Sequence, residues 1–234
     1  MTNCKNTSDM YLVTILLFEE TMEYLNVNSV KEMLIAASSA IIEKEPYLTK
    51  IDTIIGDGDH GSGMKRGFSA LKSMLEQSDF KDLWSLLRQS GMELVKTMGG
   101  ASGVLFGTLL IGGLNAVEGK DTLSAKAAAE YFAGGTKAVM ERGKASLGQK
   151  TMLDALVPAV EAMRTAARDE CSLEKSFEAA VMAANDGVEK TIDMVSMVGR
   201  SKNFREHTLG TPDPGAVSVA TILTAMHKYI KENE

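Results

Sequence analysis

The sequence has little cysteine and proline, and it has no long apolar run. Its two cysteines, Cys4 and Cys171, cannot form the disulfide framework of a small secreted protein. The apolar run at residues 11–18 is too short to span a bilayer, and Glu19 and Glu20 follow it directly. These shortages predict a cytoplasmic protein with no membrane segment and no signal peptide.

Positive charge is also scarce. The 25 lysine and arginine residues are outnumbered by 31 acidic residues, which gives a net charge of −6. Acids and bases are interspersed, and no basic stripe is visible, so nucleic acid is not an expected partner. A hydrophobic content of 44% is that of an ordinary globular protein.

Alternating strand patterns are hard to find, whereas helical periodicity runs through most of the chain. In residues 29–45 the apolar side chains recur at i, i+3, i+4 and i+7, with Asn28 or Ser29 as a possible N-cap and Pro46 at the end. We therefore predict one all-α domain of about eight helices over residues 28–234. Residues 1–27 form an N-terminal extension, either a docked helix or mostly disordered. Further helices are expected at residues 61–76, 80–97, 102–117, 124–142, 151–168, 173–189, 190–198 and 214–231, with Ser124 and Ser172 as N-caps.

Three aspartates, Asp52, Asp57 and Asp59, lie within eight residues and are separated by Gly56 and Gly58. Glycines allow the chain to turn so that the three carboxylates converge, and converging carboxylates repel one another unless a cation lies between them. Hard oxygen ligands suit Mg²⁺ or Ca²⁺ better than zinc. The spacing does not fit a calcium-binding EF-hand loop, so Mg²⁺ is the preferred ion. The alternative is a solvated acidic loop.

Two glycine-rich turns precede predicted helices, and the first of them could bind phosphate. Residues 99–103 read Gly-Gly-Ala-Ser-Gly, where backbone N–H groups and the Ser102 hydroxyl could reach an anion, although small residues also allow close helix packing. Residues 143–151 resemble a phosphate-binding P-loop, but Gln149 interrupts the motif and no strand precedes it. We interpret this second segment as a flexible turn before a helix.

A third glycine-containing segment, residues 199–215, has no apolar period and is expected to be a long loop. Long ordered loops in compact domains are usually functional, and Arg200, Lys202 and Arg205 supply cations suited to phosphate. Asp213 and Pro214 fit the N-cap and first position of the last helix. Of the histidines, His60 adjoins the aspartates, whereas His227 is expected at the surface. A magnesium cluster, open helix starts and a basic loop together indicate phosphoryl transfer.

The chain resembles the nucleotide-binding L subunit of dihydroxyacetone kinase over about residues 28–232. The resemblance rests on several motifs that occur in the expected order. They are residues 55–61 (Ile-Gly-Asp-Gly-Asp-His-Gly) with 64–68 (Met-Lys-Arg-Gly-Phe), 99–103, 150–152 (Lys-Thr-Met), 199–200 (Gly-Arg) and 213–215 (Asp-Pro-Gly).

The resemblance implies a barrel of eight antiparallel amphipathic helices that holds ADP or ATP with two Mg²⁺ ions at one end. It implies that Asp52, Asp57 and Asp59 are the metal ligands, and that His60 and Arg200 join them as catalytic residues. The ketose would be held on a separate K subunit as a covalent adduct with a histidine. The expected nucleotide-binding residues are His60, Gly61, Ser62, Gly63, Ala101, Ser102, Gly143, Met152, Arg200, Asp213, Pro214 and Gly215.

Several positions depart from the family pattern. Gly63 stands where the family often has asparagine, and the residues after Arg200 read Ser-Lys-Asn-Phe-Arg rather than Ala-Ser-Tyr-Leu-Gly. The phosphate source is left open between a phosphohistidine protein of the phosphotransferase system, which would recharge a retained ADP, and free ATP. The acceptor is dihydroxyacetone or a related ketose such as a tetrulose. The non-enzymatic alternative is a nucleotide-binding regulatory module.

Overall fold

The computed structural model describes residues 24–233, and this part of the chain is almost entirely helical. The all-α fold expected from the sequence is confirmed. The α-helices are α2 (Val27–Ile55), α3 (His60–Gln77), α4 (Leu83–Met98), α5 (Gly100–Gly112), α6 (Ala125–Gly143), α7 (Leu153–Arg168), α8 (Leu173–Ile192) and α9 (Pro214–Glu232). Two short 3₁₀ helices, η1 (Leu114–Ala116) and η2 (Ser201–Thr208), and two short strands complete the described part.

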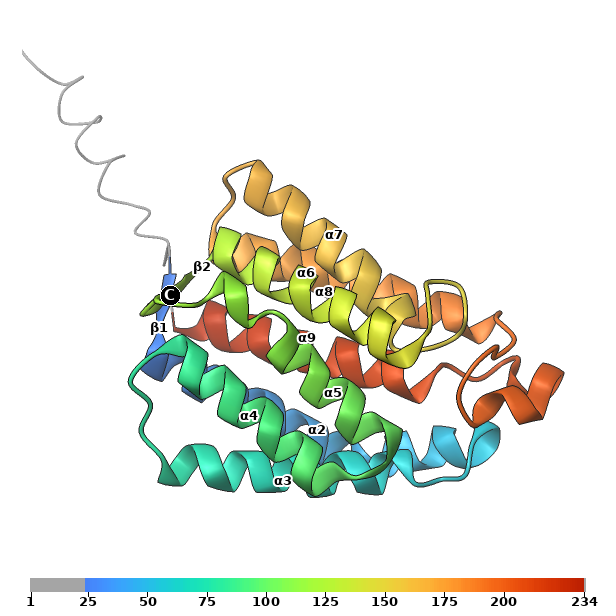
Figure 1. Ribbon diagram of the computed structural model, residues 1–234. Coiled ribbons are helices and arrows are strands. Elements are labelled where there is room, and N and C mark those ends of the chain that lie inside the picture. The colour runs from blue at the N-terminus through green and yellow to red at the C-terminus, as the bar shows by residue number, and fades with distance from the viewer. Residues whose placement is uncertain (1–23, 234) are drawn as a thin grey trace, which may run out of the picture.

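The helices are arranged as an up-and-down bundle (Figure 1). Each helix packs against the next one in the chain, and α9 returns to pack against α2, so the contacts form a ring. Because successive helices run in opposite directions, α3, α5, α7 and α9 all begin at the same end of the bundle. At the other end, strand β1 (Tyr24–Asn26) pairs antiparallel with β2 (Thr122–Ser124).

Side chains cap several helix starts. The predicted N-caps Ser124, Ser172 and Asp213 are confirmed, since each accepts a hydrogen bond from the backbone N–H three residues later. The cap of α2 was predicted at the wrong residue: Asn26, not Asn28 or Ser29, accepts from the Ser29 N–H. These caps fix where the helices begin, and therefore where the loops at each end lie.

The prediction that the first helix ends at Pro46 was wrong, because α2 continues to Ile55. Pro46 lies on the exposed face of α2, where the carbonyl that loses its N–H partner can bond to water. The following turns bury Leu48, Ile51 and Ile55. Burying each of these side chains stabilises the folded state by about 1.5–3 kcal/mol. Together they outweigh the loss of the one backbone hydrogen bond that Pro46 cannot donate. The extension carries Asp52 to the end of the bundle.

The predicted helix at residues 190–198 was also wrong, since α8 ends at Ile192. The last carbonyls of α8 bond to groups outside the helix: Lys150 Nζ donates to Thr191 O at 2.6 Å, and Gly210 N donates to Ile192 O at 2.9 Å. The expected loop at 199–215 contains η2, so it is partly helical. These bonds hold the two segments together beside the start of α9.

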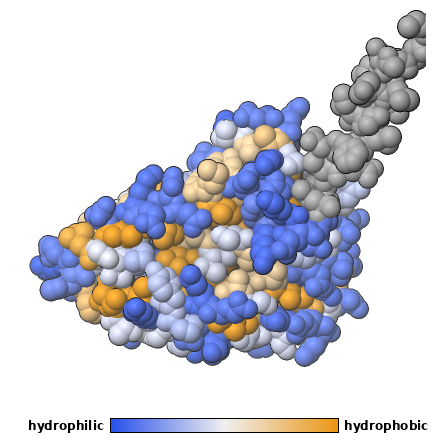
Figure 2. Space-filling view, turned by 180° about the vertical axis from the view of Figure 1, so that it is seen from behind, coloured by the Kyte–Doolittle hydropathy of each residue, from blue (hydrophilic) through white to orange (hydrophobic). Residues whose placement is uncertain are grey.

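The core is a single cluster of aliphatic, methionine and aromatic side chains that all eight α-helices contribute. The surface is mixed, with hydrophobic residues scattered between hydrophilic ones on the face drawn in Figure 2. Within residues 24–233, no helix combines the length and the apolar character that crossing a bilayer requires. The apolar run at residues 11–18 lies outside the described residues.

Candidate functional site

The three aspartates lie at the end of the bundle where the odd-numbered helices begin. Asp52 is in the last turn of α2, and Asp57 and Asp59 are in the turn between α2 and α3. One carboxylate oxygen from each lies within 4.8 Å of the other two. The sharp turn depends on Gly58, whose φ of +77° is unfavourable for other residues. The turn thus brings together carboxylates that a straight helix would separate.

The three carboxylates differ in exposure. Asp52 is buried, and its Oδ2 accepts a hydrogen bond from the backbone N–H of His60 at 3.0 Å. Asp57 and Asp59 are exposed, and the Arg200 guanidinium pairs with both of them, at 2.8 Å from Asp59 Oδ2. Arg200 comes from the loop after α8, so a cation from a distant segment lies against this acidic turn. Its side chain is 62% exposed and can move away when another cation binds.

His60 connects the N-terminal ends of three helices. Its Nδ1 lies 3.2 Å from Ser102 Oγ in α5, and its Nε2 lies 2.9 Å from Ser218 Oγ in α9. The Ser218 hydroxyl donates to the Pro214 carbonyl at 2.9 Å, so it accepts from Nε2–H. Nδ1 is then the acceptor for Ser102. Burial lowers the pKa of His60 to about 4, although nearby Asp52 acts to raise it, so the imidazole is neutral at pH 7.

Two of the helix starts at this end have open N-termini. Within residues 24–233, neither Asp59 before α3 nor Gly99 before α5 forms a side-chain cap. The first N–H groups of a helix have no partner within the helix and carry partial positive charge. Gly99 and Gly100, with φ of +75° and +60°, shape the chain where α5 begins. Both helix starts can therefore bind an anion next to the acidic turn.

A buried lysine organises the other side of the site. Lys150 Nζ donates to the carbonyl oxygens of Thr191, Met194, Thr208 and Thr211 at 2.6–3.0 Å. Asp154 accepts from the N–H groups of Gly148 and Thr151, which stabilises the turn before α7. Together these contacts tie the turn before α7 to the end of α8, to η2 and to the segment before α9.

Asp213 caps α9 and is buried. Its Oδ2 accepts from the Ala216 N–H at 2.8 Å, and its own N–H donates to Thr191 Oγ1 at 2.9 Å. Burial raises the pKa of Asp213 to about 7, and the neighbouring Asp154 adds to the effect, while the Ala216 N–H and Lys150 oppose it. Asp213 is thus a structural cap whose charge changes near neutral pH.

Most of the predicted site residues lie at this end of the bundle. Gly61, Ser62 and Gly63 form the first turn of α3, Ala101 and Ser102 that of α5, and Pro214 and Gly215 that of α9. Met152, before α7, packs against Gly215, where an added Cβ would lie 3.2 Å from the Met152 Cβ. Gly143, the last residue of α6, lies beside Leu105 of α5.

Sequence reasoning missed other residues of the site. Arg66 donates to the carbonyls of Thr97 and Met98 and so positions Gly99. Arg66 and Lys150 lie inside motifs that pointed to the site, but no pattern indicated their partners. Ser218 lies in none of the sequence motifs that pointed to the site. His227, expected at the surface, has a side chain only 16% exposed, so that expectation was wrong.

The donor set of the acidic turn fits Mg²⁺. Three carboxylate oxygens with no nitrogen or sulfur ligand are the hard donors that this ion prefers. Two of the carboxylates already pair with a cation, Arg200, which shows that the turn attracts positive charge. The open starts of α3 and α5 supply the complementary sites for anionic groups.

Comparison with known proteins agrees with this arrangement. The DAK2 domain family matches residues 54–228. The ADP-binding subunit DhaL of the PEP-dependent dihydroxyacetone kinase of Escherichia coli K12 is 38% identical over 80% of this chain and 89% of its own length. The corresponding subunit of kinase 2 of Listeria innocua is 36% identical over 82% of this chain and 90% of its own.

Longer proteins contain the same region. The D-erythrulose kinase of Mycolicibacterium smegmatis is 36% identical over 79% of this chain, which corresponds to 32% of that protein. The crystal structure of the dihydroxyacetone kinase from C. freundii with AMP-PNP and Mg²⁺ superimposes with a TM-score of 0.70 at 24% identity. The superposition covers 97% of this chain and 37% of that one, and it shows that the fold is shared.

Proposed function

The chain belongs to the DAK2 domain family, and from this premise we propose that it is the nucleotide-binding subunit of a dihydroxyacetone-type kinase. The observation that carries the proposal is the convergence of Asp52, Asp57 and Asp59 beside the open starts of α3 and α5. Carboxylates for Mg²⁺ and free N–H groups for phosphates, side by side, are what a site for Mg-nucleotide requires.

Each group has a distinct part in this proposal. Asp52, Asp57 and Asp59 hold Mg²⁺, which neutralises charge on the phosphates when it is bound. The N–H groups of Gly61, Ser62, Ala101 and Ser102 bind phosphate oxygens. Arg200 moves from the aspartates to the phosphates and offsets negative charge there.

His60 has a positioning role in this scheme. Its imidazole is neutral and both ring nitrogens contact serines, so it fixes the positions of the starts of α3, α5 and α9 relative to one another. Donors held in fixed positions stabilise a transferring phosphoryl group without reorganisation during the reaction. The family resemblance suggests two Mg²⁺ ions, and three carboxylates are enough for two ions when phosphate and water complete their shells.

The partner proteins are part of the proposal. A K subunit would hold the ketose and present it to the end of the bundle that carries the aspartates. Two relatives are named as PEP-dependent kinase subunits, which favours a phosphohistidine carrier protein that recharges bound ADP. Free ATP is the alternative donor. The chain spans about a third of two erythrulose kinases, which are named for a tetrulose substrate. A tetrulose is therefore the alternative acceptor.

The proposal is tested with the purified chain, Mg²⁺ and ADP. We expect ADP to co-purify or bind stoichiometrically, and phosphoryl transfer to dihydroxyacetone once a K subunit and a donor are added. Asp57→Ala should reduce transfer by roughly a hundredfold or more while the helical circular dichroism is retained. Lys137→Ala, an exposed substitution on α6, is the control. Full activity of Asp57→Ala would contradict the metal site, and nucleotide binding without transfer would favour a regulatory module.

A further inference from the structure

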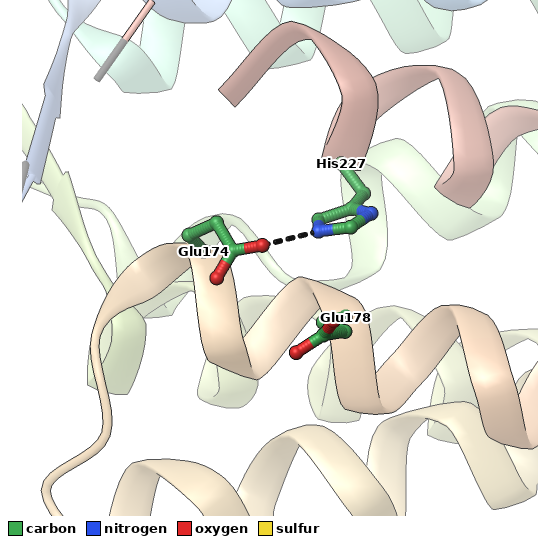
Figure 3. Close-up of side chains that lie close together, drawn as sticks. All are labelled: Glu174, Glu178 and His227. Carbon is green, nitrogen blue, oxygen red and sulfur yellow. Dashed lines mark hydrogen bonds and ion pairs between the residues drawn. The ribbon is translucent and has the colours of Figure 1, made fainter. Parts of the chain in front are cut away.

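A second group of metal-ligating side chains lies near the opposite end of the bundle. Glu174 and Glu178 are one turn apart in α8, and His227 faces them from α9 (Figure 3). His227 Nε2 lies 2.6 Å from Glu174 Oε1, and one donor atom from each residue lies within 4.8 Å of the other two. His227 comes thirteen positions after Pro214 in α9, which is about 20 Å along a helix. The group is therefore separate from the acidic turn.

The group is not an ordinary surface cluster. The side chains of Glu174 and His227 are only 8% and 16% exposed. A buried carboxylate is unfavourable unless a cation or hydrogen bonds compensate for its charge. Lys175 provides part of this compensation from outside, at 3.6 Å from Glu174 and 2.7 Å from Glu178. Its side chain is 60% exposed, so it can leave when another cation arrives.

The geometry points to a binding site for one transition-metal ion of the Zn²⁺ class, held by Glu174, Glu178 and His227. One imidazole nitrogen and two carboxylate oxygens form a mixed donor set that suits Zn²⁺, Mn²⁺ or Co²⁺ better than Mg²⁺. Figure 3 shows Nε2 directed at Glu174 and the Glu178 carboxylate on the same side of the ring. Three protein ligands from two helices leave a fourth position for water.

Side-chain movements of about 1 Å would be needed to close this site. Around a tetrahedral ion, donors at about 2.0–2.2 Å from the metal lie about 3.3–3.6 Å apart. The widest pair, which is separated by no more than 4.8 Å, must therefore approach by up to about 1.5 Å, and the His227–Glu174 pair, at 2.6 Å, must open by about 1 Å. Rotation of the Glu178 side chain supplies the first movement, because this residue is exposed enough to change rotamer. A bound ion would cross-link the first turns of α8 to α9.

The test uses the full chain, stripped of metal and kept in millimolar Mg²⁺ so that the acidic turn is saturated. Zn²⁺ is titrated by calorimetry, and Co²⁺ by its visible absorption, which reports a nitrogen ligand and low coordination number. We expect one equivalent of each ion and a higher thermal midpoint. Glu178→Gln should weaken binding by roughly tenfold or more, as should His227→Gln.

Matched variants distinguish this site from the acidic turn. Glu189→Gln, at an exposed position further along α8, should bind Zn²⁺ like the wild type. The double variant Asp57→Asn/Asp59→Asn should also still bind one equivalent of Zn²⁺. Failure to bind Zn²⁺, unchanged binding in Glu178→Gln, or loss of binding only in the Asp57/Asp59 variant would each overturn the inference.

Discussion

At the scale of single residues, Lys150 is the side chain on which the site most depends. Its ammonium group is buried and donates to four backbone carbonyls from the end of α8, η2 and the segment before α9. Burial lowers the pKa of Lys150, while Asp213 and Asp193 oppose the shift. Four carbonyl oxygens around one ammonium group thus hold the end of α8, η2 and the segment before α9 together.

Replacing Lys150 with Met should destabilise the protein strongly. The substitution keeps most of the side-chain volume but leaves four carbonyl oxygens, most of them buried, without their shared donor. We expect the free energy of unfolding to fall by about 3–5 kcal/mol, measured by urea denaturation. Lys137→Met, an exposed change on α6, is the control and should alter stability by less than about 0.5 kcal/mol. Equal stability of the two variants would contradict the role assigned to Lys150.

Asp213 predicts a pH dependence of stability. Its pKa is raised in the folded protein to about 7, so the folded state binds a proton that the unfolded chain has already lost. The resulting stabilisation is fully present below about pH 4 and is lost as the pH rises to about 7. Asp213→Asn keeps an N-cap oxygen but cannot ionise.

The difference in unfolding free energy between wild type and Asp213→Asn should therefore change by about 3–4 kcal/mol between pH 4 and pH 7, with the wild type losing stability relative to the variant. Urea denaturation of the metal-free protein at several pH values measures this difference. A constant difference across that interval would show that Asp213 is ionised throughout.

Individual residues were predictable where chemistry depends on local spacing. The aspartates, separated by glycines over eight positions, indicated their own convergence. The partners of His60 were not predictable, because Ser102 and Ser218 are 42 and 158 residues away in the chain. The same holds for His227, whose burial depends on Glu174 in another helix.

At the scale of elements, the alternating direction of the helices places four helix starts at one end. Backbone N–H groups and helix dipoles then supply positive potential to the site without many basic side chains. This explains how a chain with net charge −6 can offer an anion site. Helical periodicity predicted most of the helices, but the ends of α2 at Ile55 and of α8 at Ile192 depend on tertiary contacts that periodicity does not reveal.

The first turn of α3 provides a paired test of this packing. A Cβ on Gly61 would lie 2.5 Å from the Thr49 backbone N and 2.7 Å from Glu45 O, whereas a Cβ on Gly63 would meet nothing closer than 3.8 Å. Gly61→Ala should therefore destabilise the protein by about 1–3 kcal/mol. Gly63→Ala should stabilise it by about 0.5–1 kcal/mol through helix propensity. Thermal unfolding measures both, and the opposite order would show that α3 does not pack closely on α2.

At the scale of the whole molecule, metal and nucleotide binding should be linked to folding. If Mg²⁺ and ADP bind only the folded chain, ADP at 100 times its dissociation constant adds about 2.7 kcal/mol to the free energy of unfolding. Mg²⁺ should be required for most of this gain, and EDTA should reverse it. Asp57→Asn should lose the gain without unfolding, and Glu189→Gln should keep it. Thermal shift at fixed ADP concentration measures the effect, and an ADP gain unaffected by EDTA would contradict the magnesium role.

The position of the strand pair has a consequence for how such a domain can be joined to others. The described chain enters at β1 and leaves at the end of α9, both on the side away from the aspartates (Figure 1). Another polypeptide could therefore be attached in frame at either point without obstructing the mouth where phosphate chemistry is proposed. In the erythrulose kinases, the region that matches this chain makes up about a third of a longer polypeptide, and such a covalent extension would need no rearrangement of this helical unit.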